Sequence, residues 1–366
     1  MEKVKVMVSI TGLNVGGAEN IMLNTINNLD KSKYEIIVCS LLSGTLEKEL
    51  RKNYNVIVLG MNNIFSIPRA IFAMHKIIKS RGIQIIQSHL FHANFISRLA
   101  AIGTSAKVIA TVHSTKVDRW WYSFLDGLTS SLVEKYIAVS EGVRDYIMSK
   151  SGIPGSKIVV IPNGIDLSRF SNRVNVAKKR AELGLNKSSK VIISVANLRE
   201  GKDYPTLFTA LKIVLNYHAV ELLVVGKGES EMVYRKAAEN LGISEKVHFL
   251  GYRDDVIDLL KSSDVCVLST LYEGQSVAIL EYMASGKPIV TTDIKENREL
   301  LRGERDALLV PVKDADAMSG AIIRLLDDKK LTKKLINSAL RRVSEYHDLR
   351  KMVSHVQRVY EKVLKE

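Results

Sequence analysis

Residues 273–290, EGQSVAILEYMASGKPIV, decide how the second half of this chain is interpreted. Ser276 is predicted to cap a helix over residues 277–284, with Gly286 just after its end and Pro288 as the stop. A strand-like run, VCVLST, precedes this helix and PIVTT follows it. Amides at such a helix start point beyond the carboxyl end of the strand, where an α/β sheet holds an anion such as a diphosphate.

Two glutamates flank this helix start. Glu281 lies more than one turn inside the helix, so it cannot cap it. Its carboxylate either hydrogen-bonds a diol or is buried and needs a partner. Taken alone, Glu273 and Glu281 would be two surface glutamates on an ordinary strand–helix unit, so the rest of the chain has to decide.

The spacing of Glu273 and Glu281, with the MASGKPIV that follows, resembles the signature of family-4 (group 1) retaining glycosyltransferases. The resemblance implies that Glu281 holds the ribose hydroxyls of a nucleotide-sugar and that Glu273 faces the donor sugar as a catalytic residue. It also implies that the residues after Glu273 hold sugar and diphosphate oxygens, namely Gly274, Gln275, Ser276 and Val277. The implied fold is α/β: two Rossmann-like α/β/α domains facing across a cleft (GT-B), with a C-terminal helix that crosses back to the first domain.

Composition places the chain among globular proteins. It has 366 residues, 46% hydrophobic and 25% charged, which suits two domains. Cys39 and Cys266 each lie in an apolar run, as buried thiols of a cytosolic protein do. The N-terminus is too charged for a signal peptide, and no run approaches the roughly 18 apolar residues of a membrane span. We expect a cytoplasmic protein that is peripheral at most on the cytoplasmic membrane face.

The net charge of +14 favours an anionic partner. Nucleic acid is the weakest candidate, because there is no zinc-ligand spacing, RNP-like motif or long basic run. An anionic membrane surface is an alternative, since residues 64–79 mix apolar and basic side chains (Arg69, Lys76, Lys79) and residues 119–124 add Arg119, Trp120, Trp121, Tyr122 and Phe124. The other interpretation is that these helices simply pack on the sheet with their charges solvated.

The first half opens with a predicted strand at residues 4–10, a glycine-rich loop and a helix at residues 20–29. Gly16 and Gly17 let the backbone approach a ligand, although a plain tight turn is the alternative. The G-x-G-x-x-G spacing of dinucleotide-binding proteins is absent. The GGAE of this loop resembles the first loop of family-4 transferases, which implies that Gly16 and Gly17 face the donor diphosphate.

Three histidines follow predicted strands. His89 and His92 are three residues apart, which predicts one helix face, and no carboxylate or cysteine cluster accompanies them as a metal site would require. His113 follows the strand KVIATV, where ligands bind to a parallel sheet, or is a core or surface histidine. TVH resembles the TxH element of the family, which implies that His113 contacts the donor sugar as a catalytic residue.

The junction of the two halves is predicted near residue 170. The turn PNGID resembles the interdomain junction of the family. Its Asn163 is predicted to be a substrate-binding residue. The polar, charged residues 171–190 agree with a boundary there. We therefore expect an acceptor-binding domain at residues 1–170, a nucleotide-sugar-binding domain at 171–345 and a C-terminal helix at 346–366 that packs back on the first domain.

In the second half, Lys202 and Arg199 precede a helix start and would form a cationic clamp for a diphosphate. Lys202 matches the lysine of the family, which implies that it is a catalytic residue, whereas Asn197 stands where the family's arginine is usual. The resemblance also places the backbone around Arg253 against the nucleobase. Lys295 and Glu296 depart from the glycine pair common in the family.

No cofactor and no metal are expected. Asp314 and Asp316 form a DxD, but they directly precede an amphipathic run, so a helix-capping role is favoured. Cationic side chains and helix dipoles would stabilise the leaving group instead.

Together, these motifs predict a retaining glycosyltransferase. It would move a hexose from a UDP- or GDP-linked nucleoside diphosphate sugar to a hydroxyl of a glycan or lipid-linked glycan acceptor in cell-surface polysaccharide biosynthesis. The alternatives are a sugar-nucleotide epimerase or phosphorylase on the same fold, a non-catalytic nucleotide-sugar-binding protein, and a basic protein that binds membranes or nucleic acid.

Overall fold

The computed structural model of the protein describes residues 2–115 and 120–366. The chain forms two compact units: unit 1 is Met1–Gly164 with Leu349–Glu366, and unit 2 is Ile165–Asp348. The division falls a few residues before the expected position because the Ile165 N–H already donates to the His347 carbonyl of unit 2, at 2.9 Å. The C-terminal segment belongs to unit 1, and it begins at Leu349.

Unit 1 contains a parallel sheet of seven strands within the described residues, in the order β3-β2-β1-β4-β5-β6-β7. Their uninterrupted apolar runs suit a sheet buried on both faces. The strands are β1 Val4–Ile10, β2 Tyr34–Ser40, β3 Asn55–Val58, β4 Ile85–His89, β5 Lys107–Val112, β6 Lys135–Ala138 and β7 Ile158–Val160.

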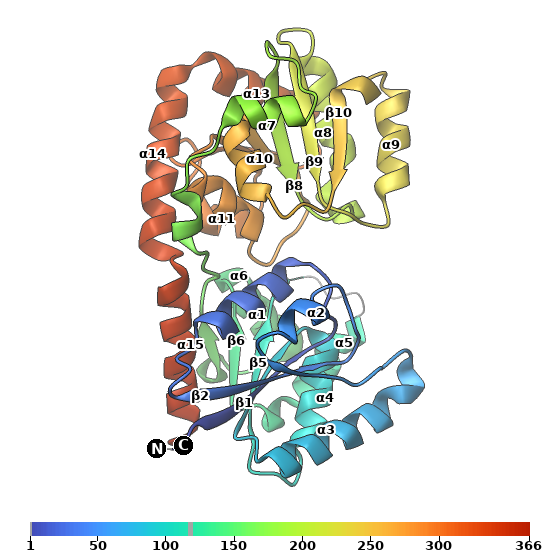
Figure 1. Cartoon of the computed structure of the whole chain (residues 1–366), viewed down its shortest axis with the longest axis vertical. Coiled ribbons are helices and arrows are strands. Elements are labelled where there is room, and N and C mark those ends of the chain that lie inside the picture. Colours follow the sequence, from blue (N-terminus) through green and yellow to red (C-terminus); the bar gives the residue numbers. More distant parts are fainter. Residues whose placement is uncertain (1, 116–119) are drawn as a thin grey trace. The chain divides into compact units, whose positions relative to one another are not determined.

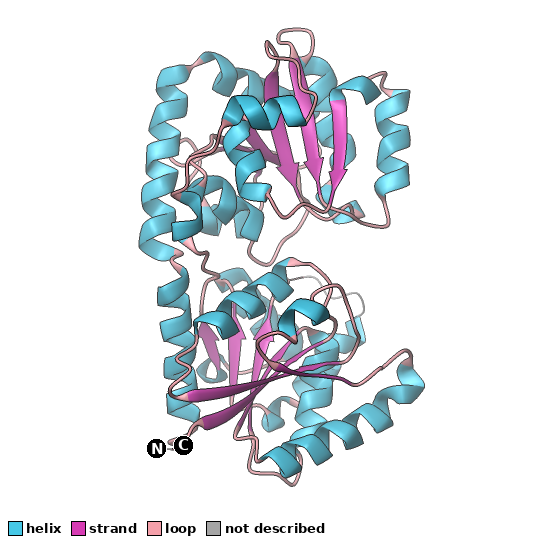
Figure 2. Cartoon of the chain, viewed as in Figure 1, coloured by secondary structure: helices cyan, strands magenta, loops and turns pink. Residues whose placement is uncertain are grey.

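Helices cover both faces of this sheet (Figures 1 and 2). Buried side chains of α3, α4 and α6 join one apolar cluster that includes Ile86 of β4. The next strand residue, Gln87, faces the other way and accepts a hydrogen bond from Tyr360 of α15, which also packs on α1. The helices are α1 Gly17–Asn28, α2 Glu47–Leu50, α3 Ile67–Arg81, α4 Phe91–Ala101, α5 Trp120–Leu128, α6 Glu141–Ser151 and α15 Leu349–Val363.

Unit 2 has a parallel sheet of six strands among the residues the structure describes, in the order β10-β9-β8-β11-β12-β13. The central strands β8 and β11 are neighbours although about 70 residues separate them. The strands are β8 Lys190–Val195, β9 Val220–Val225, β10 Val247–Gly251, β11 Val265–Leu268, β12 Ile289–Thr292 and β13 Leu308–Val310.

The helices of unit 2 also form two layers. Side chains of α8, α9 and α13 fill one apolar cluster, and those of α10, α11 and α14 fill the cluster on the other face. The helices are α7 Val176–Glu182, α8 Tyr204–Val214, α9 Glu231–Asn240, α10 Val256–Ser262, α11 Val277–Ala284, α12 Lys295–Leu300, α13 Ala315–Asp327 and α14 Lys329–Tyr346. Both units are thus Rossmann-like α/β/α layers.

Local sequence signals correspond closely to these elements. Helix α11 has the predicted bounds, the Ser276 hydroxyl accepts the Ile279 N–H, and Gly286 has φ of +66°, which a glycine adopts without strain. The Asp314 carboxylate accepts the Ala317 N–H at 2.8 Å, so it caps α13 as predicted. Cys39 and Cys266 are free, buried thiols. Helix α1, in contrast, begins at Gly17 rather than at residue 20.

None of the helices in the described residues is long and apolar enough to cross a membrane.

Candidate functional site

In unit 2 the candidate site is built from the loops that follow β8 and β11. Because these strands are parallel neighbours, both loops leave the same edge of the sheet. The Leu271 N–H and the Thr270 hydroxyl both donate to the Gly201 carbonyl, at 2.9 and 3.1 Å. The Ser269 hydroxyl donates to the Lys202 carbonyl at 2.9 Å. These bonds hold the two loops together as one surface.

Across this joint, Lys202 and Glu273 form an ion pair. Their side chains are only 22% and 12% exposed, so solvent screens the pair weakly. Gly201 allows the two loops to pack this closely, because a Cβ at this position would lie 2.4 Å from the ring of Tyr272, the residue before Glu273. The structure therefore brings two of the predicted catalytic residues into contact.

The first turn of α11 lies directly after this pair. Gly274, Gln275 and Ser276 are buried, and Val277 is partly buried as the first residue of the helix. The Ser276 cap orients the helix start at the carboxyl end of β11. The leading amides of a helix have no partner within it, and the helix dipole adds positive potential there, which suits a phosphate oxygen.

Glu281 is a partly buried carboxylate on α11. Burial raises its pKa to about 7, and the nearby charge of Arg169 only partly offsets this rise. Within the described part of the chain, no hydrogen bond or ion pair to its side chain is found. A carboxylate that is desolvated and lacks a partner can accept hydrogen bonds from a ligand diol.

The remaining predicted residues of unit 2 have different surroundings. Asn197 is partly buried, and Arg199 is exposed with no hydrogen bond or ion pair to its guanidinium among the described residues. Arg253 donates twice to Asp255, both at 2.7 Å, and these bonds hold the pKa of Asp255 well below its usual range. The Arg253 side chain is thus already engaged with Asp255.

In unit 1, Gly16, Gly17 and His113 follow strands at the same edge of the sheet. Gly16 is the extended N-cap of α1, and Gly17 is the first residue of the helix. His113 comes directly after β5, and β4 separates β5 from β1 in the sheet. A Cβ at Gly16 would lie 2.4 Å from a carboxylate oxygen of Glu19, so the loop is compact.

His113 has a partner that the sequence pattern did not assign. Nδ1 of His89 lies 2.9 Å from Nε2 of His113, and the rings are stacked with centroids 5.2 Å apart. Burial lowers the pKa of His113 to about 4, and burial together with the charge of His113 lowers that of His89 well below its usual value. Both rings are therefore neutral near pH 7, and one nitrogen donates to the other.

The prediction that His89 and His92 share a helix face is wrong. His89 is the last residue of β4, whereas His92 lies in α4 near the Tyr122 hydroxyl, at 3.3 Å. Leu90 between them has φ of +69° and ψ of 155°, a conformation that only glycine adopts easily. This turn breaks the helical spacing. The signal that was available is that His89 and His113 both end neighbouring parallel strands.

Asn163 is buried in the last segment of unit 1. The following Gly164 N–H contacts Sδ of Met352 in α15 at 3.1 Å, which ties this segment to the returning C-terminal helix. Asn163 follows the carboxyl end of β7, so it lies at the same edge of the parallel sheet as the loops that carry Gly16 and His113. As for a metal, no group of three or more histidine, cysteine or acidic side chains suited to an ion occurs within residues 2–115 and 120–366.

Two Rossmann-like units of this kind are the architecture of GT-B glycosyltransferases. Residues 175–342 match the family described as "Glycosyl transferases group 1", and residues 15–169 match "Glycosyltransferase Family 4". Together the two matches cover most of the chain. The protein belongs to these group 1 glycosyltransferases, which use a nucleotide-sugar donor.

Individual relatives agree with this assignment. The chain is 25% identical, over 92% of its length and 93% of the relative, to an Escherichia coli UDP-Gal:alpha-D-GlcNAc-diphosphoundecaprenol alpha-1,3-galactosyltransferase. It is 29% identical to a Mycolicibacterium smegmatis phosphatidyl-myo-inositol mannosyltransferase, over 76% of this chain and 71% of that one. The crystal structure of Anabaena HepE in complex with UDP and glucose has the same fold, with a TM-score of 0.88, 19% identity and coverage of 98% and 99%.

Proposed function

We propose that this protein is a retaining glycosyltransferase that moves a hexose from a UDP-sugar to a hydroxyl of a lipid-linked glycan, in cell-surface polysaccharide biosynthesis. The observation that carries the proposal is the Lys202–Glu273 pair beside the first turn of α11. It combines a cation, a carboxylate and helix amides at one edge of the sheet. The name of the E. coli relative, with its UDP-galactose donor and diphospholipid acceptor, supports the choice of substrates.

The chemistry requires stabilisation of a diphosphate that leaves with its charge. Lys202 supplies an ammonium group, and the α11 amides and dipole supply further positive potential without a metal. In the free enzyme Glu273 holds the ammonium in place. When the donor binds, Lys202 turns to the phosphate oxygens, and the Glu273 carboxylate becomes available to hydroxyls of the donor sugar. Glu281 accepts the ribose hydroxyls.

The first test is thermal unfolding of the protein with UDP, with GDP and with no nucleotide. UDP at about one hundred times its Kd should stabilise the folded protein by about 2.7 kcal/mol, since it binds only the native state. The same shift should persist in EDTA, because the proposed site uses no metal. A shift with GDP instead of UDP contradicts the base assignment, and a shift that EDTA abolishes contradicts metal independence.

Peripheral contact with an anionic membrane is part of the proposal, through residues 64–79. Ile64, Phe65 and Phe72 are 72%, 87% and 72% exposed, and the basic residues of the predicted surface, Arg69, Lys76 and Lys79, lie in the same α3 segment. An apolar strip edged by cations suits the interface of an anionic bilayer.

The other half of the predicted membrane surface requires correction. Tyr122 is buried and stacks on Phe91, with ring centroids 3.8 Å apart, so it packs inside unit 1. Phe124 remains 62% exposed. Arg119 and the side chain of Trp120 lie outside the described residues.

We expect Phe65→Ser combined with Phe72→Ser to weaken binding to phosphatidylglycerol vesicles at least tenfold. The variant lacks the two large apolar side chains that would insert into the bilayer interface. Vesicle flotation measures the effect. The matched control is Met232→Ser with Val233→Ser, which removes two apolar side chains of α9 that are 76% and 66% exposed. Equal vesicle binding by the two double variants would rule out residues 64–79 as the membrane-binding surface.

A further inference from the structure

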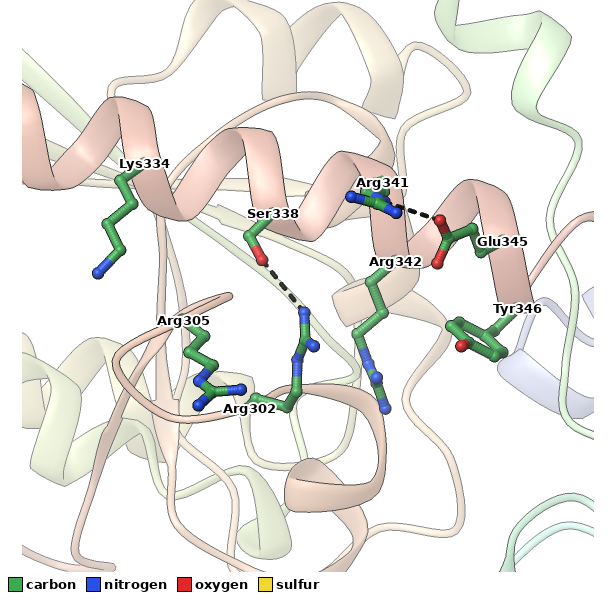
Figure 3. A pocket seen from close by; sticks show the side chains of 8 residues that line it. All are labelled: Arg302, Arg305, Lys334, Ser338, Arg341, Arg342, Glu345 and Tyr346. Atoms are coloured by element: carbon green, nitrogen blue, oxygen red, sulfur yellow. Dashed lines mark hydrogen bonds and ion pairs between the residues drawn. The ribbon is translucent and has the colours of Figure 1, made fainter.

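A basic pocket of about 540 Å³ lies within unit 2 (Figure 3). One side is the segment after α12 and the other is a face of α14. None of its lining residues belongs to the loops after β8 or β11. The pocket is lined by Arg302, Arg305, Lys334, Ser338, Arg341, Arg342, Glu345 and Tyr346.

Two of its arginines are held in fixed positions. Arg302 donates to both carboxylate oxygens of the buried Asp306, at 2.8 and 2.9 Å, and to the Ser338 hydroxyl at 3.2 Å. Arg342 donates to the carbonyls of Leu300 and Glu299, at 2.6 and 2.9 Å, at the end of α12. Guanidinium groups that are already oriented lose less entropy when they bind a ligand.

Two other cations of the pocket have no protein partner. Arg305 and Lys334 are exposed, and no hydrogen bond or ion pair to either side chain occurs in the described part of the chain. Arg341 is paired with Glu345 at 2.8 Å. Five cations therefore face two carboxylates, counting Asp306 beneath the pocket, and the excess positive charge is uncompensated.

The chemistry of the lining points to phosphate. Arginine and lysine side chains donate hydrogen bonds and accept none, and the planar arginine fork matches a phosphate group. From Lys334 to Arg342 the cations of the α14 face extend over about 12 Å, at 1.5 Å per residue. One phosphate is too small to reach cations spread over that length, whereas linked phosphates can.

We propose that this pocket binds an anion carrying two or more phosphate groups. The ligand is either a soluble polyphosphorylated molecule or the phosphorylated headgroup of a lipid. Arg302 and Arg342 form the rigid base of the site, and Arg305 and Lys334 close on the phosphates. The proposal does not depend on the proposed sugar transfer, since it uses other residues.

Calorimetric titration of the full chain with inorganic tripolyphosphate, in EDTA, tests the site. Arg305→Glu with Lys334→Glu should weaken binding at least tenfold, because two cations that attract phosphate are replaced by carboxylates that repel it. Both side chains are exposed, so the variant should fold normally. The matched control is Lys330→Glu with Lys333→Glu, an equal charge change at exposed positions of α14 outside the pocket. This control should bind within about twofold of the unchanged protein.

The donor site could also take up tripolyphosphate, so the titration is repeated with Lys202→Met. Binding that survives in Lys202→Met and disappears in the pocket variant supports the proposal. Loss in Lys202→Met alone places the anion at the donor site and overturns it. Equal loss in the pocket variant and in the α14 control shows attraction by net charge only, which also overturns it, as does an absence of binding.

Vesicle flotation separates the two sources of the ligand. Vesicles with a bisphosphorylated inositol lipid are compared with phosphatidylserine vesicles of equal total charge. Retention that is specific to the bisphosphorylated lipid and lost in the pocket variant identifies a headgroup. Pocket-dependent binding of tripolyphosphate without such retention identifies a soluble ligand.

Discussion

Replacing Lys202 by methionine should lower the turnover number by roughly two to three orders of magnitude, as loss of one donor to a developing negative charge does in other enzymes. The ammonium is paired with the Glu273 carboxylate where the loops after β8 and β11 meet. The leaving diphosphate gains charge in the transition state, so the interaction with Lys202 is stronger there than with the bound donor. The effect should therefore appear in kcat more than in KM.

Two companion variants make this result specific. Lys212→Met removes an exposed lysine from the last turn of the neighbouring α8 and should leave turnover unchanged. Lys202→Met with Glu273→Gln tests whether an unpaired, partly buried carboxylate, rather than the missing cation, causes the loss. Thermal unfolding of each variant confirms that it is folded. A kcat within twofold of the unchanged enzyme would remove Lys202 from the reaction.

Glu281 should make donor binding depend on pH. Burial raises the pKa of this carboxyl to about 7, and the proposed ribose hydroxyls would donate more strongly to its ionised form, in which both oxygens accept, than to the protonated form. Below pH 7 a growing fraction of the carboxyl is protonated and binds the ribose more weakly, so the affinity for UDP should fall by up to about tenfold per pH unit there. Above pH 7 this dependence should disappear. Calorimetry across pH measures the affinity and the proton release.

Glu281→Gln should weaken UDP binding about tenfold to a hundredfold at pH 8. It should also remove the part of the pH dependence of UDP affinity that comes from this carboxyl. The phosphates of UDP also titrate, but they do so equally with both proteins. Comparing the UDP affinities of the unchanged protein and the variant at each pH therefore removes this contribution. Replacing UDP by 2′-deoxy-UDP should cost the unchanged protein more affinity than it costs Glu281→Gln, since the lost hydroxyl and the lost carboxylate are partners. Additive losses would contradict the ribose assignment.

The same residue has an opposite effect on folding. A carboxyl whose pKa is higher in the folded than in the unfolded state stabilises the fold fully below the unfolded pKa of 4.5, and that stability is lost as the pH rises to about 7. Free Glu281→Gln should therefore be at least as stable as the unchanged protein at pH 8. If Glu281→Gln binds UDP weakly but has a melting temperature no lower than that of the unchanged protein, Glu281 acts on the ligand and not on the stability of the fold.

Much of the molecule follows from local signals in the chain. Helix α11, its Ser276 cap and the Gly286 that ends it follow from capping and apolar periodicity, which act within one turn. The capping role of Asp314 follows in the same way. The order of the motifs also identified the family and the fold, because each motif is short and contiguous.

Contacts between separate loops could not be read in this way. Lys202 and Glu273 are 71 positions apart, and they meet because β8 and β11 are adjacent in the sheet. His89 and His113 meet because β4 and β5 are adjacent, and a backbone of unusual φ at Leu90 turns His92 away. Strand order depends on the packing of the whole unit, so a spacing rule cannot supply it.

The family, the alternation of strands and helices, the helix caps and the residues worth testing could all be predicted from the amino-acid sequence. The folded chain was needed to find which of those residues touch, which are buried enough for their pKa to move, and that Arg302 and Arg305 face the cations of α14 across one pocket. The difference comes from the distance along the chain over which each interaction acts. Caps and periodicity act over a few residues, whereas burial and charge pairing depend on segments that the fold brings together from distant parts of the chain.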